Sequence, residues 1–183
     1  DQLDALDPAR PNHGVGQQVR VCARSLAGMQ KEAIVGSSRP GCLWRLASDE
    51  GPYLDGFDAA PCPLSFMTVG MVSSYMDALR AAAQRRSLDI RDLTLTQDNR
   101  YTMAGSALQG TMTGGALPVA LEVRIDVDAD DDAVSDLVTE AVGAAPANGL
   151  QRERHTSRFT LTVNGEPLPL DRATPLPDAA APD

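Results

Sequence analysis

The stretch that decides the fold is Pro61-Cys62-Pro63-Leu64-Ser65-Phe66-Met67-Thr68-Val69-Gly70-Met71-Val72-Ser73-Ser74-Tyr75-Met76, and Asp77 is the first charge after it. Proline is favoured in the first turn of a helix, because its missing N–H has no partner there, so Pro63 predicts a helix start. We expect one helix across 60–86. Apolar side chains cover its whole circumference from Leu64 to Met76, which predicts a helix enclosed by its own protein or by a partner subunit. The uncharged run falls short of the about 20 apolar residues of a membrane span, so no membrane partner is expected.

Composition excludes several classes of protein. The 183 residues fit one domain with tails, since a domain has about 100–200 residues. A net charge of −9 repels phosphate backbones, and the largest basic cluster is Arg85-Arg86, so no nucleic-acid partner is expected. Cys22, Cys42 and Cys62 cannot all pair within one chain, and the N-terminus has no secretion signal. A reduced, cytoplasmic location is therefore expected.

Periodicity along the chain predicts an α+β fold with antiparallel sheets, a long buried central helix and a second, shorter helix. We expect an N-terminal arm over 1–17, a folded domain over 18–165 and a Pro-rich, extended or disordered tail over 166–183. Within the domain we expect strands over 18–24, 29–36, 42–47, 88–96, 100–113, 118–127 and 158–164, a loop over 49–60 and a helix over 133–144.

Several local signals sharpen these expectations. Val19, Val21 and Ala23 alternate with polar residues, which predicts a half-buried strand, and 118–127 alternates even more regularly. Asp130 to Asp132 offer an N-cap and first-turn anions to the second helix. Pro146 and Gly149 are expected to end that helix. Gly105 and Gly110 predict a bend or bulge within the strand over 100–113, and Asn164-Gly165 predicts a turn.

Metal and cofactor chemistry has little support. His13 and His155 lack a Cys or a second His at ligand spacing, so no zinc site is expected. The acidic run from Asp126 begins like a calcium loop, but Asp131 stands where the loop needs Gly and Leu137 where it needs Glu. No metal and no cofactor are expected.

Cys62 is the residue whose position favours reactivity. It falls at the start of the long helix, where the positive end of the macrodipole and free N–H groups stabilise a thiolate. The alternative interpretation is a small buried residue that closes the entrance to the helix. Both remain open from the sequence.

The run from Pro63 to Ser74, Ala144-Ala145-Pro146 after the second helix, and the order of the elements resemble the OsmC/Ohr superfamily over 18–165. The resemblance implies an intertwined homodimer in which the long helices pack centrally between sheets shared by both chains. It also implies a bacterial protein of the oxidative stress response. Enzymes of that superfamily reduce organic hydroperoxides with two cysteines, assisted by an Arg and a Glu.

Residue by residue, the implied peroxidase centre is mostly missing. The central-helix cysteine falls on Ser74, the second cysteine on Ala145 and the Glu on Leu64, while Arg20 or Arg24 could supply the Arg. An alcohol at Ser74 cannot form a sulfenic acid, and Ala145 cannot resolve one.

Three hypotheses follow from the resemblance. The preferred one is a member without the standard cysteine pair that keeps an apolar pocket at the dimer interface for a small apolar ligand. The second is an active thiol-dependent hydroperoxide reductase that uses a relocated thiol, Cys62, with Cys22 or Cys42 as its partner. The third is an inert dimer with a filled core. Residues expected to line the pocket are Leu64, Met67, Met71, Tyr75, Arg20 and Arg24.

Overall fold

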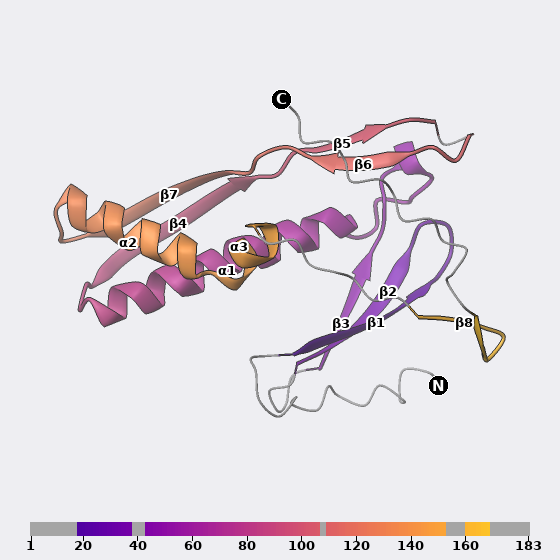
Figure 1. Cartoon of the computed structure of the whole chain (residues 1–183), viewed down its shortest axis with the longest axis horizontal. Coiled ribbons are helices and arrows are strands. Elements are labelled where there is room, and N and C mark those ends of the chain that lie inside the picture. Colours follow the sequence, from indigo (N-terminus) through magenta and orange to yellow (C-terminus); the bar gives the residue numbers. More distant parts are fainter. Residues whose placement is uncertain (1–17, 38–42, 107–108, 153–159, 169–183) are drawn as a thin grey trace.

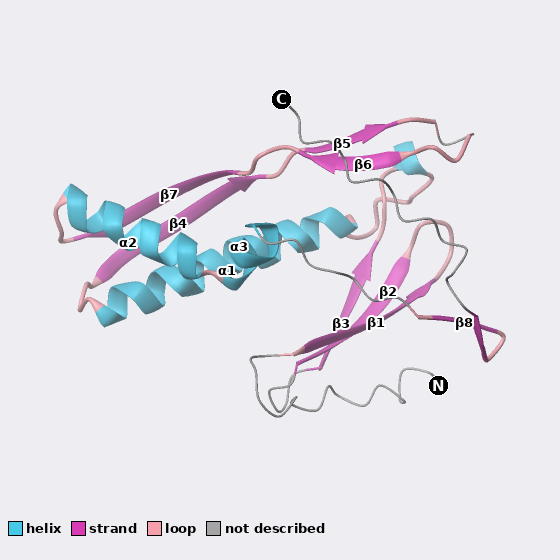
Figure 2. Ribbon diagram, in the orientation of Figure 1, coloured by secondary structure: helices cyan, strands magenta, loops and turns pink. Residues whose placement is uncertain are grey.

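The computed structural model describes residues 18–37, 43–106, 109–152 and 160–168. They form an α+β fold of antiparallel strand pairs and three α-helices, as predicted (Figure 2). A three-stranded N-terminal sheet lies at one end of the long helix, and a long strand pair runs along the other end (Figure 1).

The N-terminal sheet has the order β1-β2-β3, with strands β1 (Val19–Ser25), β2 (Lys31–Ser37) and β3 (Leu43–Ser48). The three expected strands are confirmed, and the hairpin register pairs Val21 with Val35. Every residue of β1 is nevertheless exposed, with Val19 at 56% and Val21 at 58%. The expectation of a half-buried strand is therefore wrong for a single chain, because the described residues do not cover its apolar side.

Helix α1 (Pro63–Arg85) is the predicted long helix, with Cys62 as its N-cap and Pro63 in its first turn. Its own chain covers one face: the buried residues are Met71, Tyr75, Leu79, Ala82 and Ala83. Towards its N-terminus, Leu64, Met67 and Val69 stay 44%, 46% and 63% exposed. The described part of one chain therefore does not enclose the helix.

The core lies where α1 packs against strand β4 (Ile90–Asp98) and helix α2 (Asp131–Ala144). Strand β4 pairs antiparallel with β7 (Ala120–Val127), whose expected alternation of half-buried and exposed residues is confirmed. Burying a side chain of leucine size stabilises a fold by about 1.5–3 kcal/mol. The buried cluster consists of Leu79, Ala82, Ala83, Leu93, Leu137 and Ala141.

Helix α2 begins as predicted. The Asp130 carboxylate accepts a hydrogen bond from the Ala133 N–H at 2.8 Å, and Asp131 and Asp132 lie in the first turn. An Asp N-cap stabilises a helix by about 1 kcal/mol relative to Ala.

The expectation of one bent strand is wrong, and the expectation that Pro146 and Gly149 end the second helix is confirmed for Pro146 alone. Residues 100–113 do not form one bent strand. They form most of a hairpin, β5 (Tyr101–Ala104) with β6 (Thr113–Ala116), and Gly105 turns the chain at φ +100°. Pro146 ends α2 but also starts a third helix, α3 (Pro146–Arg152), which includes Gly149. The pre-proline residue Ala145 is extended, as the proline ring requires, and this separates the two helices.

The C-terminal end also differs in part. Strand β8 (Leu161–Val163) confirms the last predicted strand within the described residues, and Asn164 and Gly165 form its turn at φ 51° and 87°. Positive φ at both positions is typical of a two-residue hairpin turn. That turn leads into β9 (Glu166–Leu168), so the first described residues after the turn, at the start of the predicted tail, form an extended strand paired with β8.

Among the described residues, no helix is both long and apolar enough to cross a membrane.

The core makes a direct prediction about stability. Leu79 is 0% exposed, so Leu79→Ala should lower the free energy of unfolding by about 2–5 kcal/mol, measured by urea denaturation. Leu150 is 65% exposed on α3, so Leu150→Ala should change it by no more than about 0.5 kcal/mol. Equal losses in the two variants would contradict this assignment of the core.

Candidate functional site

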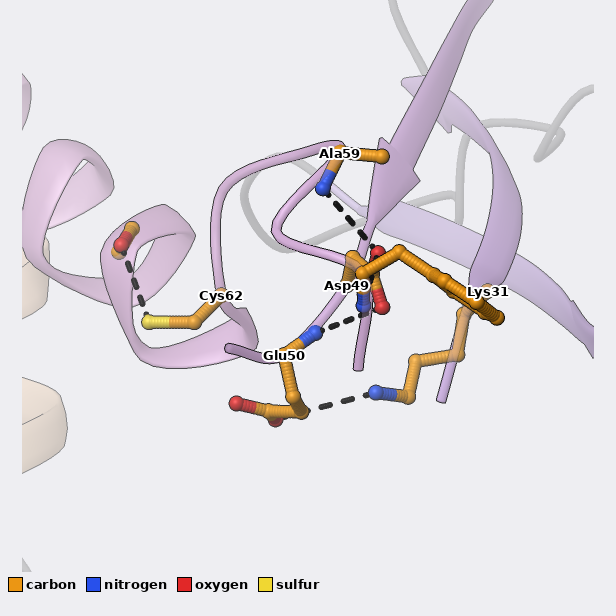
Figure 3. Close-up of polar contacts among 7 residues, drawn as sticks. Lys31, Asp49, Glu50, Ala59 and Cys62 are labelled. Carbon is orange, nitrogen blue, oxygen red and sulfur yellow. Dashed lines mark hydrogen bonds and ion pairs between the residues drawn. The ribbon is translucent and has the colours of Figure 1, made fainter. Parts of the chain in front are cut away.

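The loop before α1 is fixed by a buried carboxylate. Asp49 is 0% exposed. Its Oδ1 accepts the Glu50 N–H at 2.8 Å, and its Oδ2 accepts the N–H groups of Phe57 at 3.1 Å and Ala59 at 3.2 Å (Figure 3). Burial, the largest single influence, raises the pKa of Asp49, but these three donors and the Gln30 side chain together hold the pKa below its ordinary value. Asp49 thus holds the backbone of the loop next to Cys62 in one conformation.

Cys62 sits on the first turn of α1 with its thiol beside Ser65. The Cys62 sulfur lies 3.2 Å from the Ser65 hydroxyl oxygen. The hydroxyl of Ser65 is the main cause that lowers the pKa of the Cys62 thiol, followed by the backbone N–H of Ser65; burial and the charge of Glu50 act in the opposite direction. The thiol is partly exposed, and Cys62 is the N-cap of α1, the position predicted from the sequence.

An open groove of about 450 Å³ lies beside this thiol. We name it the Cys62 groove. Its wall changes from aliphatic and hydroxyl side chains of α1 to polar side chains at the end of β4 and the start of β5. The lining residues are Cys62, Leu64, Ser65, Thr68, Val69, Gln97, Asp98, Asn99 and Tyr101.

Behind the polar wall, three carboxamides surround one sulfur atom, which we name the Met71 amide cluster. The Met71 Sδ accepts from Gln97 Nε2 at 3.6 Å, Asn99 Nδ2 at 3.6 Å and Gln151 Nε2 at 3.4 Å. The chain of donors continues from Gln97 to Asn99 Oδ1 at 2.7 Å and from Asn99 to the Tyr101 hydroxyl at 3.0 Å. Met71 itself is only 4% exposed.

Ser74 and Ala145 come from distant parts of the sequence and meet where α1 contacts α3. The Ser74 hydroxyl accepts the N–H of Ala147 at 3.3 Å. Ala145 is 1% exposed and packs in one cluster with Met71 and Tyr75. The two positions that the resemblance pairs are therefore neighbours in the fold, with an alcohol and a methyl group where a thiol pair would stand.

A second, larger groove passes Ser74, and we name it the Ser74 groove. It measures about 910 Å³ and runs along the small residues of α1. Its lining residues are Val19, Gly70, Ser73, Ser74, Asp77, Ala78, Ala81, Arg85, Ala144 and Pro146.

The residues expected to line one pocket are spread over three environments. Leu64 lines the Cys62 groove, and Met67 is half-exposed on α1. Met71 and Tyr75, each 4% exposed, belong to the core and line neither groove.

Arg20 and Arg24 lie on the exposed strand β1. Arg24 pairs with Glu32 of the next strand at 2.7 Å. Val19, and neither arginine, is the β1 residue that lines the Ser74 groove. The possible thiol partners of Cys62 are an exposed Cys22 and Cys42, which lies outside the described residues.

Sequence reasoning missed Asp49 and the amide cluster. Asp49 precedes a loop with Gly51-Pro52, and an Asp at such a place often accepts backbone N–H groups, so this signal was present. Gln97, Asn99 and Gln151 have no shared sequence signal, because they converge only through the pairing of β4 and the placement of α3. No group of three or more His, Cys, Asp or Glu side chains that could hold a metal ion occurs in the part of the chain that the structure describes.

OsmC-like and organic hydroperoxide resistance proteins are among the solved structures with a similar fold. An OsmC-like hydroperoxide resistance protein from Jannaschia sp. CCS1 aligns with a TM-score of 0.54 and 21% identity, over 83% of this chain and 97% of its own. The organic hydroperoxide resistance protein OsmC from Legionella pneumophila aligns with a TM-score of 0.55 and 18% identity, over 74% and 89%. An OsmC-like protein from Mycoplasma pneumoniae gives 0.54 and 13%, over 74% and 87%. The chain has the fold of these proteins.

No protein-family model matches the sequence, and no curated protein has a significant match to it.

The Asp49 contacts predict a pH dependence of folding. Since the folded-state pKa is below the unfolded value, the stabilisation is present above the unfolded pKa of about 3.9 and is lost as the pH falls through the lower folded pKa. Asp49→Asn should therefore be less stable than wild type at pH 7, and the difference should shrink towards pH 3, measured by thermal unfolding. A difference that is constant from pH 7 to pH 3 would contradict a role for the charge.

The Ser65 contact predicts the acidity of the thiol. In a background with Cys22 and Cys42 replaced by Ser, the rate of iodoacetamide alkylation against pH should give a Cys62 pKa below the ordinary value of about 8.5. Ser65→Ala should raise that pKa because it removes the main cause. Thr68→Val is the matched control, since the Thr68 hydroxyl donates to the Leu64 carbonyl at 3.0 Å in the same groove. An equal rise in both variants would argue against the Ser65 contact.

Proposed function

We propose that the chain is a divergent OsmC/Ohr-like protein that works as a homodimer and binds a small apolar ligand at the dimer interface. The observation that carries this proposal is the apolar, uncovered side of α1, where Leu64, Met67 and Val69 are 44–63% exposed. Monomeric proteins rarely leave large contiguous apolar surfaces in water, and such surfaces mark interaction sites. The similar fold of hydroperoxide resistance proteins supports the same conclusion.

The Ser74 groove is the proposed seat of the partner helix. Small side chains at Gly70, Ser73, Ala78 and Ala81 let another helix approach closely, and Val19 of the exposed strand β1 lies at the same groove. A second α1 placed there would cover the small residues that line this groove on both helices. The ligand pocket would then form between the two helices and the Cys62 groove, which is apolar on the α1 side.

The standard peroxidase chemistry is not part of this proposal. Peroxide reduction by thiols starts with a thiolate that becomes a sulfenic acid and continues with a second thiol. Ser74 and Ala145 occupy that place without a sulfur atom. The low pKa of Cys62 in an open groove favours the second candidate, a relocated thiol-dependent hydroperoxide reductase. It ranks lower because Cys62 is twelve helical positions from Ser74, which corresponds to about 18 Å.

We also place the protein in the cytoplasm, as the sequence led us to expect. The two described cysteines, Cys22 and Cys62, are free thiols, which is the ordinary state of cysteine in a reducing compartment.

The dimer is tested by a pair of glycine substitutions. A side chain at Gly70 would meet nothing of its own chain within 4 Å, and the same holds for Gly143 on α2. Gly70→Leu should shift the protein from dimer to monomer in analytical ultracentrifugation by at least tenfold in the dissociation constant, because it fills the proposed seat of the partner. Gly143→Leu should stay dimeric. A monomeric wild type, or a dimeric Gly70→Leu variant, would contradict the proposed interface.

The activity is tested with cumene hydroperoxide and dithiothreitol, for wild type and Cys62→Ser. We expect no catalytic turnover in either protein, and saturable binding of the corresponding alcohol, 2-phenyl-2-propanol, in calorimetry. Turnover that is lost in Cys62→Ser would establish the relocated reductase instead. Neither turnover nor binding would point to a dimer without a ligand pocket.

A further inference from the structure

We propose that Met71 is a site of methionine sulfoxide formation by organic hydroperoxides, and that the Met71 amide cluster binds the sulfoxide oxygen. The inference is independent of the dimer and of Cys62. It rests on three carboxamide groups that converge on one buried thioether.

The hydrogen bonds to the Met71 sulfur are weak in the reduced state. A thioether sulfur is a weak acceptor, yet the amide nitrogens of Gln97, Asn99 and Gln151 lie 3.6, 3.6 and 3.4 Å from it. Apolar contacts alone would satisfy a core methionine. A polar S=O group accepts far more strongly than a thioether, so oxidation would strengthen the contacts of these three amide groups with the Met71 side chain.

The donors come from three separate elements, which makes their convergence a tertiary feature. Gln97 ends β4, Asn99 lies in the turn to β5, and Gln151 lies on α3. The Gln97 amide is further fixed by its 2.7 Å bond to Asn99, which in turn donates to Tyr101.

The reaction balances with the hydroperoxide as the oxidant. A lone pair of the Met71 sulfur attacks the terminal peroxide oxygen, so the S–O bond forms as the O–O bond breaks. The hydroperoxide proton passes to the departing alkoxide, which leaves as the alcohol. The thioether loses two electrons and the peroxide gains them. Negative charge develops on the oxygens during this step, where preorganised N–H donors stabilise it.

The Cys62 groove brings an oxidant to the outer side of the amide cluster, although Met71 itself does not line the groove. Gln97 and Asn99 line that groove on one side and contact Met71 on the other, so the cluster forms the wall between them. A volume of about 450 Å³ is within the range of small-molecule sites. The apolar side of the groove at Leu64 and Val69 suits the organic part of the hydroperoxide.

If solvent accessibility alone set the rate, Met71 would be oxidised after the exposed methionines. The proposal predicts the opposite order and can therefore be tested directly. Met103 is 65% exposed and Met67 is 46% exposed, whereas Met71 is 4% exposed. Methionines without special surroundings should oxidise in order of exposure. Met71 should instead be oxidised first.

The experiment treats the full-length protein, with its cysteines alkylated, with one equivalent of cumene hydroperoxide and follows each methionine by peptide mass spectrometry. We expect the sulfoxide to form at Met71 at least fivefold faster than at Met103, which serves as the internal control. Slower oxidation of Met71 than of Met103 would overturn the proposal.

A pair of variants separates donor chemistry from simple opening of the core. Gln151→Leu removes one donor from a helix surface and should slow the oxidation of Met71 by about tenfold without changing that of Met103. Gln84→Leu, an exposed glutamine of α1, is the matched control and should change neither rate. Circular dichroism melting establishes that both variants fold. An unchanged or faster Met71 rate in Gln151→Leu would show that the amides do not assist the reaction.

Discussion

The constraint on which the structure depends is a helix that is apolar around its whole circumference for its first half. The chain itself satisfies this constraint on one side only. Leu79, Ala82 and Ala83 close the C-terminal half against β4 and α2, but Val69 is still 63% exposed. Each uncovered apolar side chain forgoes about 1–3 kcal/mol of burial. The exposed strand β1, whose Val19 lines the Ser74 groove, presents the same problem on a sheet. The homodimer proposed above would solve both problems with one contact.

The middle and the N-terminal end of α1 differ in chemistry because they are buried to different extents. The middle of the helix, at Ser74, is held against α3 by a hydrogen bond to Ala147 and is closed by Ala145. The N-terminal end opens into a groove with a polar wall, next to a thiol with a lowered pKa. The helix macrodipole and free N–H groups act over only the first turn, so a thiol at Cys62 and one at Ser74 would not be equivalent even in the same helix.

How much could be predicted depends on whether the signal was local. Helices α1 and α2 could be predicted because Pro63 and Asp130 are each a local signal for the N-terminus of a helix. The sequence predicts a bulge at Gly105, because a glycine within a strand and a glycine at a turn give the same sequence pattern. Only the pairing of β5 with β6 distinguishes the two. The sequence predicts that Pro146 ends a helix, because proline cannot continue the helix before it. Its fixed φ equally suits the first turn of the helix that follows. The burial of β1 and of Met71 could not be predicted. Alternation along a strand and an apolar circumference around a helix indicate that a face is apolar, but not what covers it.

The candidate site follows the same division. The position of Cys62 at a helix start is a property of three consecutive residues, Pro61, Cys62 and Pro63, and was accessible from the sequence. Its acidity depends on Ser65, one helical turn away, and on a loop that Asp49 holds in place. The Met71 amide cluster needs β4, the β4–β5 turn and α3 in their final positions, so no sequence pattern contains it. Local order therefore explains where a reactive sulfur can stand, and tertiary packing decides which polar groups face it and what reaction they favour.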